Sequence, residues 1–225
     1  MKKKITGVTM IVTLLLAGIS SEAQYKQRSS KPANQTVIQK PYYGPQEELV
    51  QTFIRNNSDV RVLSDTASAL PREEGFVFQS SKNGLVTSLG VNMPNVGGTY
   101  TVSLWDYDTR QLLKQYPVTV TTMGFGFAYV DMEAISEAVP IAANKKYVVS
   151  VFIKTNELNK WPYYYLLRSG ANNTAVPFLP FTQASLTLIN GQTIITSAPA
   201  FPDTMVYHMD ILNGLCDVGF KATEK

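Results

Sequence analysis

Aromatic side chains gather in one short segment, Trp161-Pro162-Tyr163-Tyr164-Tyr165, which follows a polar stretch at 155–160. An aromatic ring offers an apolar face to a sugar ring, and nearby amide and guanidinium groups supply directional hydrogen bonds. The side chains that would form such a glycan-binding site are those of Trp161, Tyr163, Tyr165, Asn159 and Arg168. The competing interpretation is a strand whose alternating tyrosines pack into a hydrophobic core. The residues alone leave both interpretations open.

Few residues could support nucleophilic or zinc chemistry. His208, the only histidine, stands two residues before Asp210, and Cys216, the only cysteine, lies in an apolar strand pattern. No serine occupies a recognisable nucleophile elbow, and one histidine with one cysteine cannot provide the usual four ligands of zinc. We therefore expect His208 and Cys216 to be structural, and we expect the chain not to be an enzyme.

Paired carboxylates could hydrolyse glycosidic bonds, so the acidic residues form a third candidate group. The pairs available are Glu73 with Glu74, Asp106 with Asp108, and Glu133 with Glu137. None of these pairs is distinguished by its sequence context. A glycoside-active enzyme therefore ranks third, after a glycan-binding or adhesive module and a structural surface protein. Asp106 and Asp108 lie in a turn, where aspartate commonly bonds the backbone. They are weak candidates for a calcium site, and we expect neither a metal nor a cofactor.

The elements that must position these residues are strands. In the segment 85–93, apolar side chains recur at every second position, which is the period of a half-buried strand. Further strands are expected at 75–78, 99–106, 112–116 and 125–132. The segment 146–153 is apolar on both faces apart from Ser150, which predicts a central strand. We expect Trp105 to lie in the core.

The C-terminal part of the chain continues the strand pattern. Asn190-Gly191 lies between two apolar runs and predicts a hairpin with strands at 184–189 and 193–196. The last strands are expected at 205–212 and 216–220. Short strands separated by turns, with no convincing helical stretch, predict an all-β fold: an antiparallel two-sheet β-sandwich resembling a jelly roll.

The N-terminus has the features of an export signal. Three lysines precede an apolar run, and Ser21-Glu22-Ala23 fits a cleavage site, so residues 1–23 are predicted to be a signal peptide. Residues 24–58 are expected to be a flexible, disordered lead-in, within which 47–55 fits either a short helix or an edge strand. One sandwich domain is expected over 59–225. Because the apolar run is short and no cysteine stands just after it, we expect no membrane span after cleavage and no lipid anchor.

Charge and cysteine content narrow the class of protein further. The formal net charge is +3, and removal of residues 1–23 leaves 17 basic and 16 acidic residues, or +1. No basic stripe remains, so nucleic acid is not an expected partner. A single cysteine excludes an internal disulfide, and stability must come from burial in the core.

Several motifs occur together in order: Phe76-Val77-Phe78, Asn83-Gly84-Leu85-Val86-Thr87-Ser88-Leu89, Gly98-Thr99, Ser103-Leu104-Trp105-Asp106, and Pro140-Ile141 with Asn144 before Lys146-Tyr147-Val148-Val149-Ser150-Val151. With this series, the chain resembles the domain of unknown function 4082, a family of exported bacterial sandwich domains. The resemblance covers roughly residues 70–152, with closing strands at 205–220. It implies a jelly-roll-like extracellular fold, often beside carbohydrate-active or adhesive modules, and no established activity. The insert at 161–181 departs from the pattern.

Two functions remain after these exclusions. The first is an exported, non-catalytic module, periplasmic or at the cell surface, that binds a polysaccharide or surface glycan or acts in adhesion. The second is a structural surface protein that contacts other proteins through a sheet edge or an apolar patch.

Overall fold

The structure, a computed structural model, describes residues 42–67, 70–121, 126–154, 161–170 and 174–224. The predicted signal peptide and the lead-in up to residue 41 lie outside the described residues. Within the described part, the strands form three sheets in which neighbouring strands pair antiparallel. The predicted all-β antiparallel sandwich is confirmed.

The largest sheet has seven strands in the order β11-β12-β3-β9-β5-β6, with β13 paired to β12. Their bounds are β3 (Arg72–Ser80), β5 (Thr99–Asp106), β6 (Leu112–Thr119), β9 (Lys146–Ile153), β11 (Phe181–Gln183), β12 (Leu186–Ile195) and β13 (Thr204–Val206). The strand predicted to be central, β9, lies between β3 and β5 and is buried along its length after Lys146.

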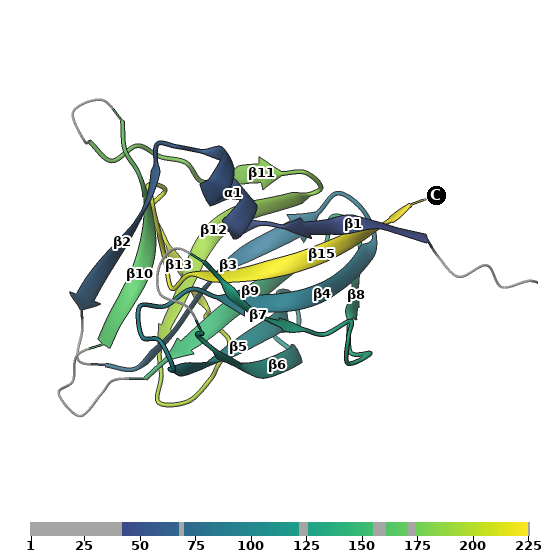
Figure 1. The fold of residues 1–225 in the computed structure, drawn as a ribbon, viewed down its shortest axis with the longest axis horizontal. Helices are drawn as coiled ribbons and strands as arrows, with labels where there is room; N and C mark the ends of the chain where they lie inside the picture. The colour runs from purple at the N-terminus through teal and green to yellow at the C-terminus, as the bar shows by residue number, and fades with distance from the viewer. Residues whose placement is uncertain (1–41, 68–69, 122–125, 155–160, 171–173, 225) are drawn as a thin grey trace, which may run out of the picture. The chain divides into compact units, whose positions relative to one another are not determined.

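Two smaller sheets face this one. The five-stranded sheet has the order β1-β15-β4-β7, with β8 paired to β4, and the three-stranded sheet has the order β14-β10-β2. Their bounds are β1 (Tyr42–Glu48), β2 (Val60–Ala67), β4 (Gly84–Val91), β7 (Ala128–Asp131), β8 (Val139–Ile141), β10 (Trp161–Arg168), β14 (Ile211–Asn213) and β15 (Cys216–Glu224). In Figure 1, β15 and β4 cross in front of β3 and β9, so that the two larger sheets form the layers of the sandwich.

The core lies between the layers because the strands alternate apolar side chains toward it. Phe76 and Phe78 of β3 meet Leu89 of β4 and Leu166 of β10 in one buried cluster, to which all three sheets contribute. Cys216 is part of this cluster. A second, smaller buried cluster, formed by Val77, Trp105 and Val148, lies on the opposite face of the seven-stranded sheet.

The ordered domain begins earlier than residue 59. Residues predicted to be lead-in form β1 and the helix α1 (Val50–Asn56), so the segment for which helix and strand were both open contains one of each. Leu49, Val50 and Phe53 are buried in the main cluster. Their spacing places three apolar side chains on one side of a helical turn. Burial of these side chains offsets the conformational entropy that the segment loses when it becomes ordered.

The predicted hairpin at Asn190-Gly191 is wrong. The strand β12 runs through both residues, paired with β3 on one side and with β13 on the other, with a register shift between Leu188 and Asn190. The tight hairpin turn favoured by Asn-Gly needs positive φ, and neither residue has it. Because β12 is paired along both of its edges here, the chain continues as a strand, and the register shift between Leu188 and Asn190 is accommodated as a β-bulge.

Candidate functional site

The outer face of the seven-stranded sheet is partly covered by the segment 196–203, which joins β12 to β13. Val148 pairs with Val77 on one side and with Trp105 on the other, so these three side chains share this face. Phe201, from the covering segment, packs against them. Its ring meets the Trp105 ring edge-on, with centroids 6.0 Å apart and an interplanar angle of 85°.

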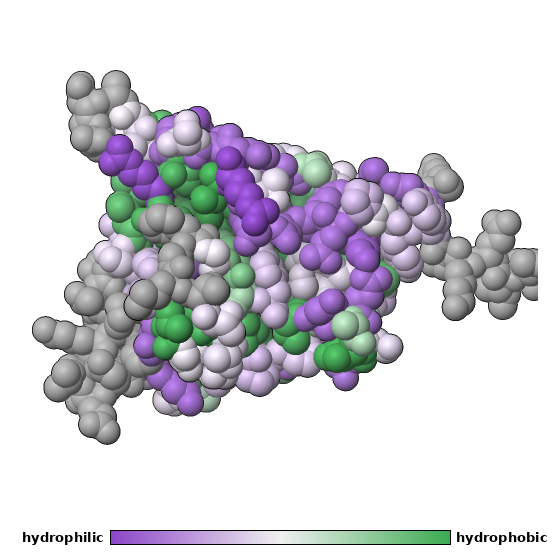
Figure 2. All heavy atoms as spheres, viewed as in Figure 1, coloured by the Kyte–Doolittle hydropathy of each residue, from purple (hydrophilic) through white to green (hydrophobic). Residues whose placement is uncertain are grey.

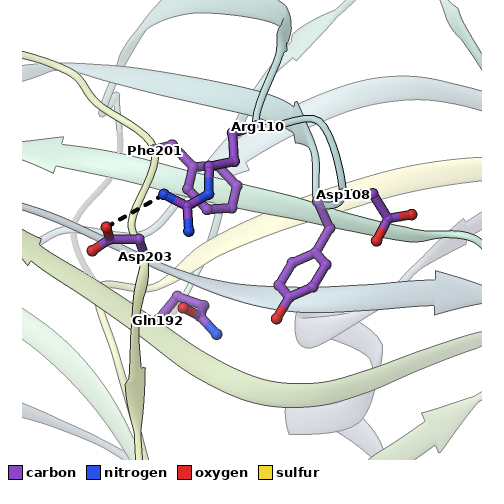
Figure 3. A pocket seen from close by; sticks show the side chains of 6 residues that line it. Asp108, Arg110, Gln192, Phe201 and Asp203 are labelled. Carbon is purple, nitrogen blue, oxygen red and sulfur yellow. Dashed lines mark ion pairs between the residues drawn. The ribbon is translucent and has the colours of Figure 1, made fainter.

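A pocket of about 270 Å³ lies beside this contact. We call it the Tyr107–Phe201 pocket; its lining residues are Tyr107, Asp108, Arg110, Gln192, Phe201 and Asp203. The first three come from the turn between β5 and β6, Gln192 comes from β12, and the last two come from the covering segment. Figure 3 shows these side chains and the place of Arg110 across the ring of Phe201.

The pocket combines aromatic rings with charged and amide groups. The Arg110 guanidinium carbon is 5.5 Å from the centroid of the Phe201 ring, and Arg110 Nη1 is 3.7 Å from Asp203 Oδ2. Lys146 Nζ is 5.5 Å from the centroid of the Tyr107 ring. Gln192 is only 4% exposed although it lines the pocket. A buried amide can both donate and accept hydrogen bonds, so Gln192 adds a neutral polar group to the aromatic and charged groups of the lining.

A chain of buried hydrogen bonds lies beneath the pocket. Trp105 Nε1 donates to Ser150 Oγ at 2.9 Å, and the Ser150 hydroxyl donates to Glu73 Oε1 at 2.5 Å. Burial raises the pKa of Glu73 to about 8, against the opposing effect of the hydrogen bond from Ser150. Glu73 is therefore mainly a neutral acid at pH 7.

Two of the residues predicted to bind a glycan do share a hollow. Tyr163 and Tyr165 of β10 line a pocket of about 280 Å³ together with His208, Ile211 and Asn213. The two tyrosine rings are 6.2 Å apart at 47°, and both residues are half-buried. Tyr163 also packs against the main core cluster. The core and surface interpretations of this segment therefore both have structural support.

The remaining residues of the predicted glycan site are not gathered there. Trp161 begins β10, where its backbone pairs with Ala67, and Asn159 lies outside the described residues. Arg168, at the end of the same strand, instead donates from Nε to Asp59 Oδ2 at 2.6 Å. This bond lowers the pKa of Asp59 below its ordinary value. Arg168 is thus engaged in an ion pair outside the lining of the tyrosine pocket.

Asp106 has a structural function in the turn after β5. Its Oδ1 accepts hydrogen bonds from the backbone of Asp108 and Thr109 at 3.1 Å each, and its Oδ2 lies 2.5 Å from Lys145 Nζ. Asp108 is exposed. Both carboxylate oxygens of Asp106 therefore already have partners within the protein. Among the described residues, no group of three or more potential ligands could hold a metal ion.

The only histidine and the only cysteine occupy different surroundings. The His208 side chain is 74% exposed and lies between β13 and β14, with Nδ1 3.9 Å from Asp210 Oδ1. It therefore does not lie on a strand face. Cys216 is fully buried, its Sγ lies 3.4 Å from the Val149 carbonyl oxygen, and burial raises the pKa of its thiol well above the ordinary value. A buried thiol of this kind is not a nucleophile.

The candidate carboxylate pairs are separated by the fold. Glu73 faces the covering segment, whereas Glu74, the next residue on the strand, faces the other side and bonds Arg72. Glu133 pairs with Lys221, and Glu137 pairs with Lys114. These ion pairs are at the surface.

Sequence reasoning missed most of the Tyr107–Phe201 pocket. Its lining combines residues 107–110 with residues 192–203, which are far apart in the chain. Gln192 was expected next to a hairpin turn, outside both predicted strands. One signal was present: Phe201 is a large aromatic residue between Pro199 and Pro202, in a stretch otherwise made of small residues. An aromatic side chain in such a loop must either pack onto a neighbouring surface or remain exposed.

Comparison with known proteins assigns the chain to a family. The model of the family described as domain of unknown function (DUF4082) matches residues 59–209. This range includes every lining residue of the Tyr107–Phe201 pocket and, in the tyrosine pocket, every lining residue except Ile211 and Asn213 of β14. No curated protein matches the chain. In the part of the chain that is described, none of the helices has the length and apolar character needed to cross a membrane.

Proposed function

We propose that this chain, which belongs to the family called domain of unknown function 4082, is an exported, non-catalytic module that binds a neutral sugar of a polysaccharide or surface glycan in the Tyr107–Phe201 pocket. The observation that carries the proposal is the buried amide of Gln192 in a pocket with two aromatic rings and an arginine–aspartate pair. The export part rests on the sequence of residues 1–23.

The chemistry of the lining supports a sugar as ligand. A sugar has an apolar face of C–H groups that stacks on an aromatic ring, and hydroxyls that donate and accept hydrogen bonds. Arg110 can donate, Asp203 can accept, and Gln192 can do both. Arg110 and Asp203 are 3.7 Å apart, so each has hydrogen-bonding positions left for a ligand.

The charge balance supports a neutral ligand. Arg110 and the nearby Lys146 oppose the carboxylates of Asp108 and Asp203. A uronic acid or a phosphate would need a net positive site, which this lining does not supply. A neutral hexose avoids that requirement.

The test is a glycan array with the purified protein from Gln24 onward, followed by calorimetry with the sugars that bind. Tyr107→Ala and Arg110→Ala should each weaken binding at least tenfold. Trp161→Ala and Tyr165→Ala test the site predicted from the sequence. If only the second pair loses binding, the site lies at β10. If neither pair has an effect, both sites are wrong.

The second candidate, a protein-contacting surface module, has its own observation. Met205 of β13 is 43% exposed, and Tyr207, just after it, is 80% exposed. Figure 2 also shows a hydrophobic area between α1 and β2. Pairing at the sheet edges is less favoured, because Pro45 lies in edge strand β1 and Lys114 and Pro117 lie in edge strand β6. Silence across the array would favour this candidate.

A further inference from the structure

The Tyr107–Phe201 pocket and the tyrosine pocket, which is lined by Tyr163, Tyr165, His208, Ile211 and Asn213, share one segment of chain. Asp203 lines the first pocket and His208 lines the second. These two residues stand five positions apart in the chain, so their Cα atoms are separated by at most about 17 Å even in a fully extended backbone. The two pockets are therefore close to each other.

The strand β13 lies between these two lining residues and is paired to the wall of the first pocket. Met205 of β13 pairs with Gln192 of β12, and the side chains of directly paired residues project from the same face of a sheet. Because Gln192 lines the Tyr107–Phe201 pocket, Met205 stands beside that pocket on the same face. Met205 is also exposed. It therefore extends the apolar part of the lining beyond the pocket.

Tyr207 continues this surface toward the tyrosine pocket. It is 80% exposed and directly precedes His208, which lines that pocket. Such an exposed tyrosine buries little of its ring in the fold, whereas it offers a ligand an apolar ring face and a hydroxyl that donates and accepts hydrogen bonds. The residues between the two pockets, 204–207, include no charged side chain. The connection between the pockets is therefore apolar and neutral.

Each pocket adds hydrogen-bonding groups to its aromatic rings. In the Tyr107–Phe201 pocket these groups are the Arg110 guanidinium, the Asp203 carboxylate and the buried Gln192 amide. In the tyrosine pocket they are the phenol hydroxyls, the Asn213 amide and the His208 imidazole. The described residues that line the tyrosine pocket include no acid, lysine or arginine. Both pockets thus offer an apolar face together with groups that bond hydroxyls.

A linear chain of neutral sugars matches this arrangement. Each unit of such a chain presents an apolar face of C–H groups and several hydroxyls, and the next units present the same groups again. The two pockets have nearly equal volumes, about 270 and 280 Å³. Two hollows of similar size and similar chemistry, joined by a neutral surface, fit two units of one repeating ligand.

We propose that the two pockets are subsites of one extended site for a linear, neutral oligosaccharide, with Met205 and Tyr207 between them. The proposal rests on the proposed function, because it requires a sugar in the Tyr107–Phe201 pocket. It adds that the ligand is a run of several units within a polysaccharide. Once one subsite is occupied, binding at the other is intramolecular, so affinity rises with the length of the ligand.

The first measurement is affinity as a function of ligand length. Calorimetry with the purified protein from Gln24 onward compares linear series built on glucose, mannose or xylose, each with two, four and six units. In the series that binds, we expect the dissociation constant to fall about tenfold or more from the disaccharide to the hexasaccharide, with one hexasaccharide bound per protein. Equal affinity at every length, or two hexasaccharides per protein, would overturn the extended site.

The second measurement tests the surface between the pockets. Tyr207→Ala should weaken hexasaccharide binding about fivefold and leave disaccharide binding unchanged, because a disaccharide fits within one pocket. Tyr42→Ala is the matched control, since Tyr42 is also an exposed tyrosine, at 71%, but lies on β1 outside both pockets. Its removal should change neither affinity. The same loss in both variants, or no loss in Tyr207→Ala, would refute the role of Tyr207.

Variants in the two pockets separate this inference from the proposed function. Arg110→Ala and Tyr165→Ala should each reduce hexasaccharide affinity to near that of the disaccharide. If Arg110→Ala weakens binding while Tyr165→Ala and Tyr207→Ala have no effect, the proposed function stands and the extended site is wrong. If no oligosaccharide of any length binds, both fail.

Discussion

The Tyr129 hydroxyl donates a 2.7 Å hydrogen bond to Asp217 Oδ2 beneath the start of α1. The same buried carboxyl group accepts the backbone N–H groups of Val50 and Gln51 at 2.8 and 2.9 Å. One aspartate of β15 therefore ties the start of α1 to two strands of the five-stranded sheet, β15 and β7.

Loss of this carboxylate should destabilise the domain. Asp217→Ala leaves buried N–H groups of α1 without an acceptor, so we expect the free energy of unfolding to fall by about 3 kcal/mol. Urea denaturation of the natural protein and the variant measures this difference in the free energy of unfolding. Asp131→Ala is the control, because Asp131 accepts one backbone bond, from Ala134, at an exposed turn, and its loss should be below about 1 kcal/mol. Equal losses in the two variants would refute the role given to Asp217.

Glu73 should make stability depend on pH. The folded protein holds this proton up to a pKa of about 8, above the ordinary value of 4.5, so its contribution is fully present below pH 4.5 and is lost as pH rises to 8. At about 1.4 kcal/mol per pH unit between 4.5 and 8, the loss is of the order of 5 kcal/mol. Urea denaturation at pH 5, 6.5 and 8 should show the natural protein losing stability relative to Glu73→Gln. A constant difference between the two proteins would contradict this assignment.

Two glycines should respond to alanine for different reasons. At Gly75 an added Cβ would lie 2.1 Å from the Val149 carbonyl oxygen and 2.6 Å from the Ser150 Cα, so strands β3 and β9 would have to separate. At Gly97 the added atom meets nothing within 4 Å, but φ is +83°. We expect Gly97→Ala to cost about 1 kcal/mol and Gly75→Ala to cost clearly more. Thermal unfolding of the two variants ranks their losses of stability. A larger loss in Gly97→Ala than in Gly75→Ala would argue against the close approach of β3 and β9 at Gly75.

Calcium should not stabilise the protein. The oxygens of Asp106 already accept the Asp108 and Thr109 backbone groups and pair with Lys145. Millimolar calcium should therefore leave the melting temperature unchanged relative to the same concentration of magnesium. A calcium-specific rise that disappears in Asp108→Asn would show that the turn binds this ion after all.

The pattern of residues was sufficient for the fold class and for several of the strands. Period-two alternation located β4, the apolar run at 146–153 identified β9 as central, and Trp105 was correctly expected in the core. Each of these features follows from the local pattern of apolar side chains, because apolar side chains are buried away from water when the chain folds. The Asn190-Gly191 turn failed because strand pairing on both edges of β12 overrode a local preference.

The site depended on tertiary structure. Tyr107 is separated by a long stretch of chain from Gln192 and Phe201. The three residues meet because β5 and β12 lie in one sheet and the segment 196–203 folds back over it. The neutral state of Glu73 likewise follows from burial beneath that segment. The sequence by itself determined which segments become strands and which of their faces avoid water. Which distant side chains share a pocket was decided by the order of strands in the sheet, because long-range pairing sets distances that local patterns do not contain.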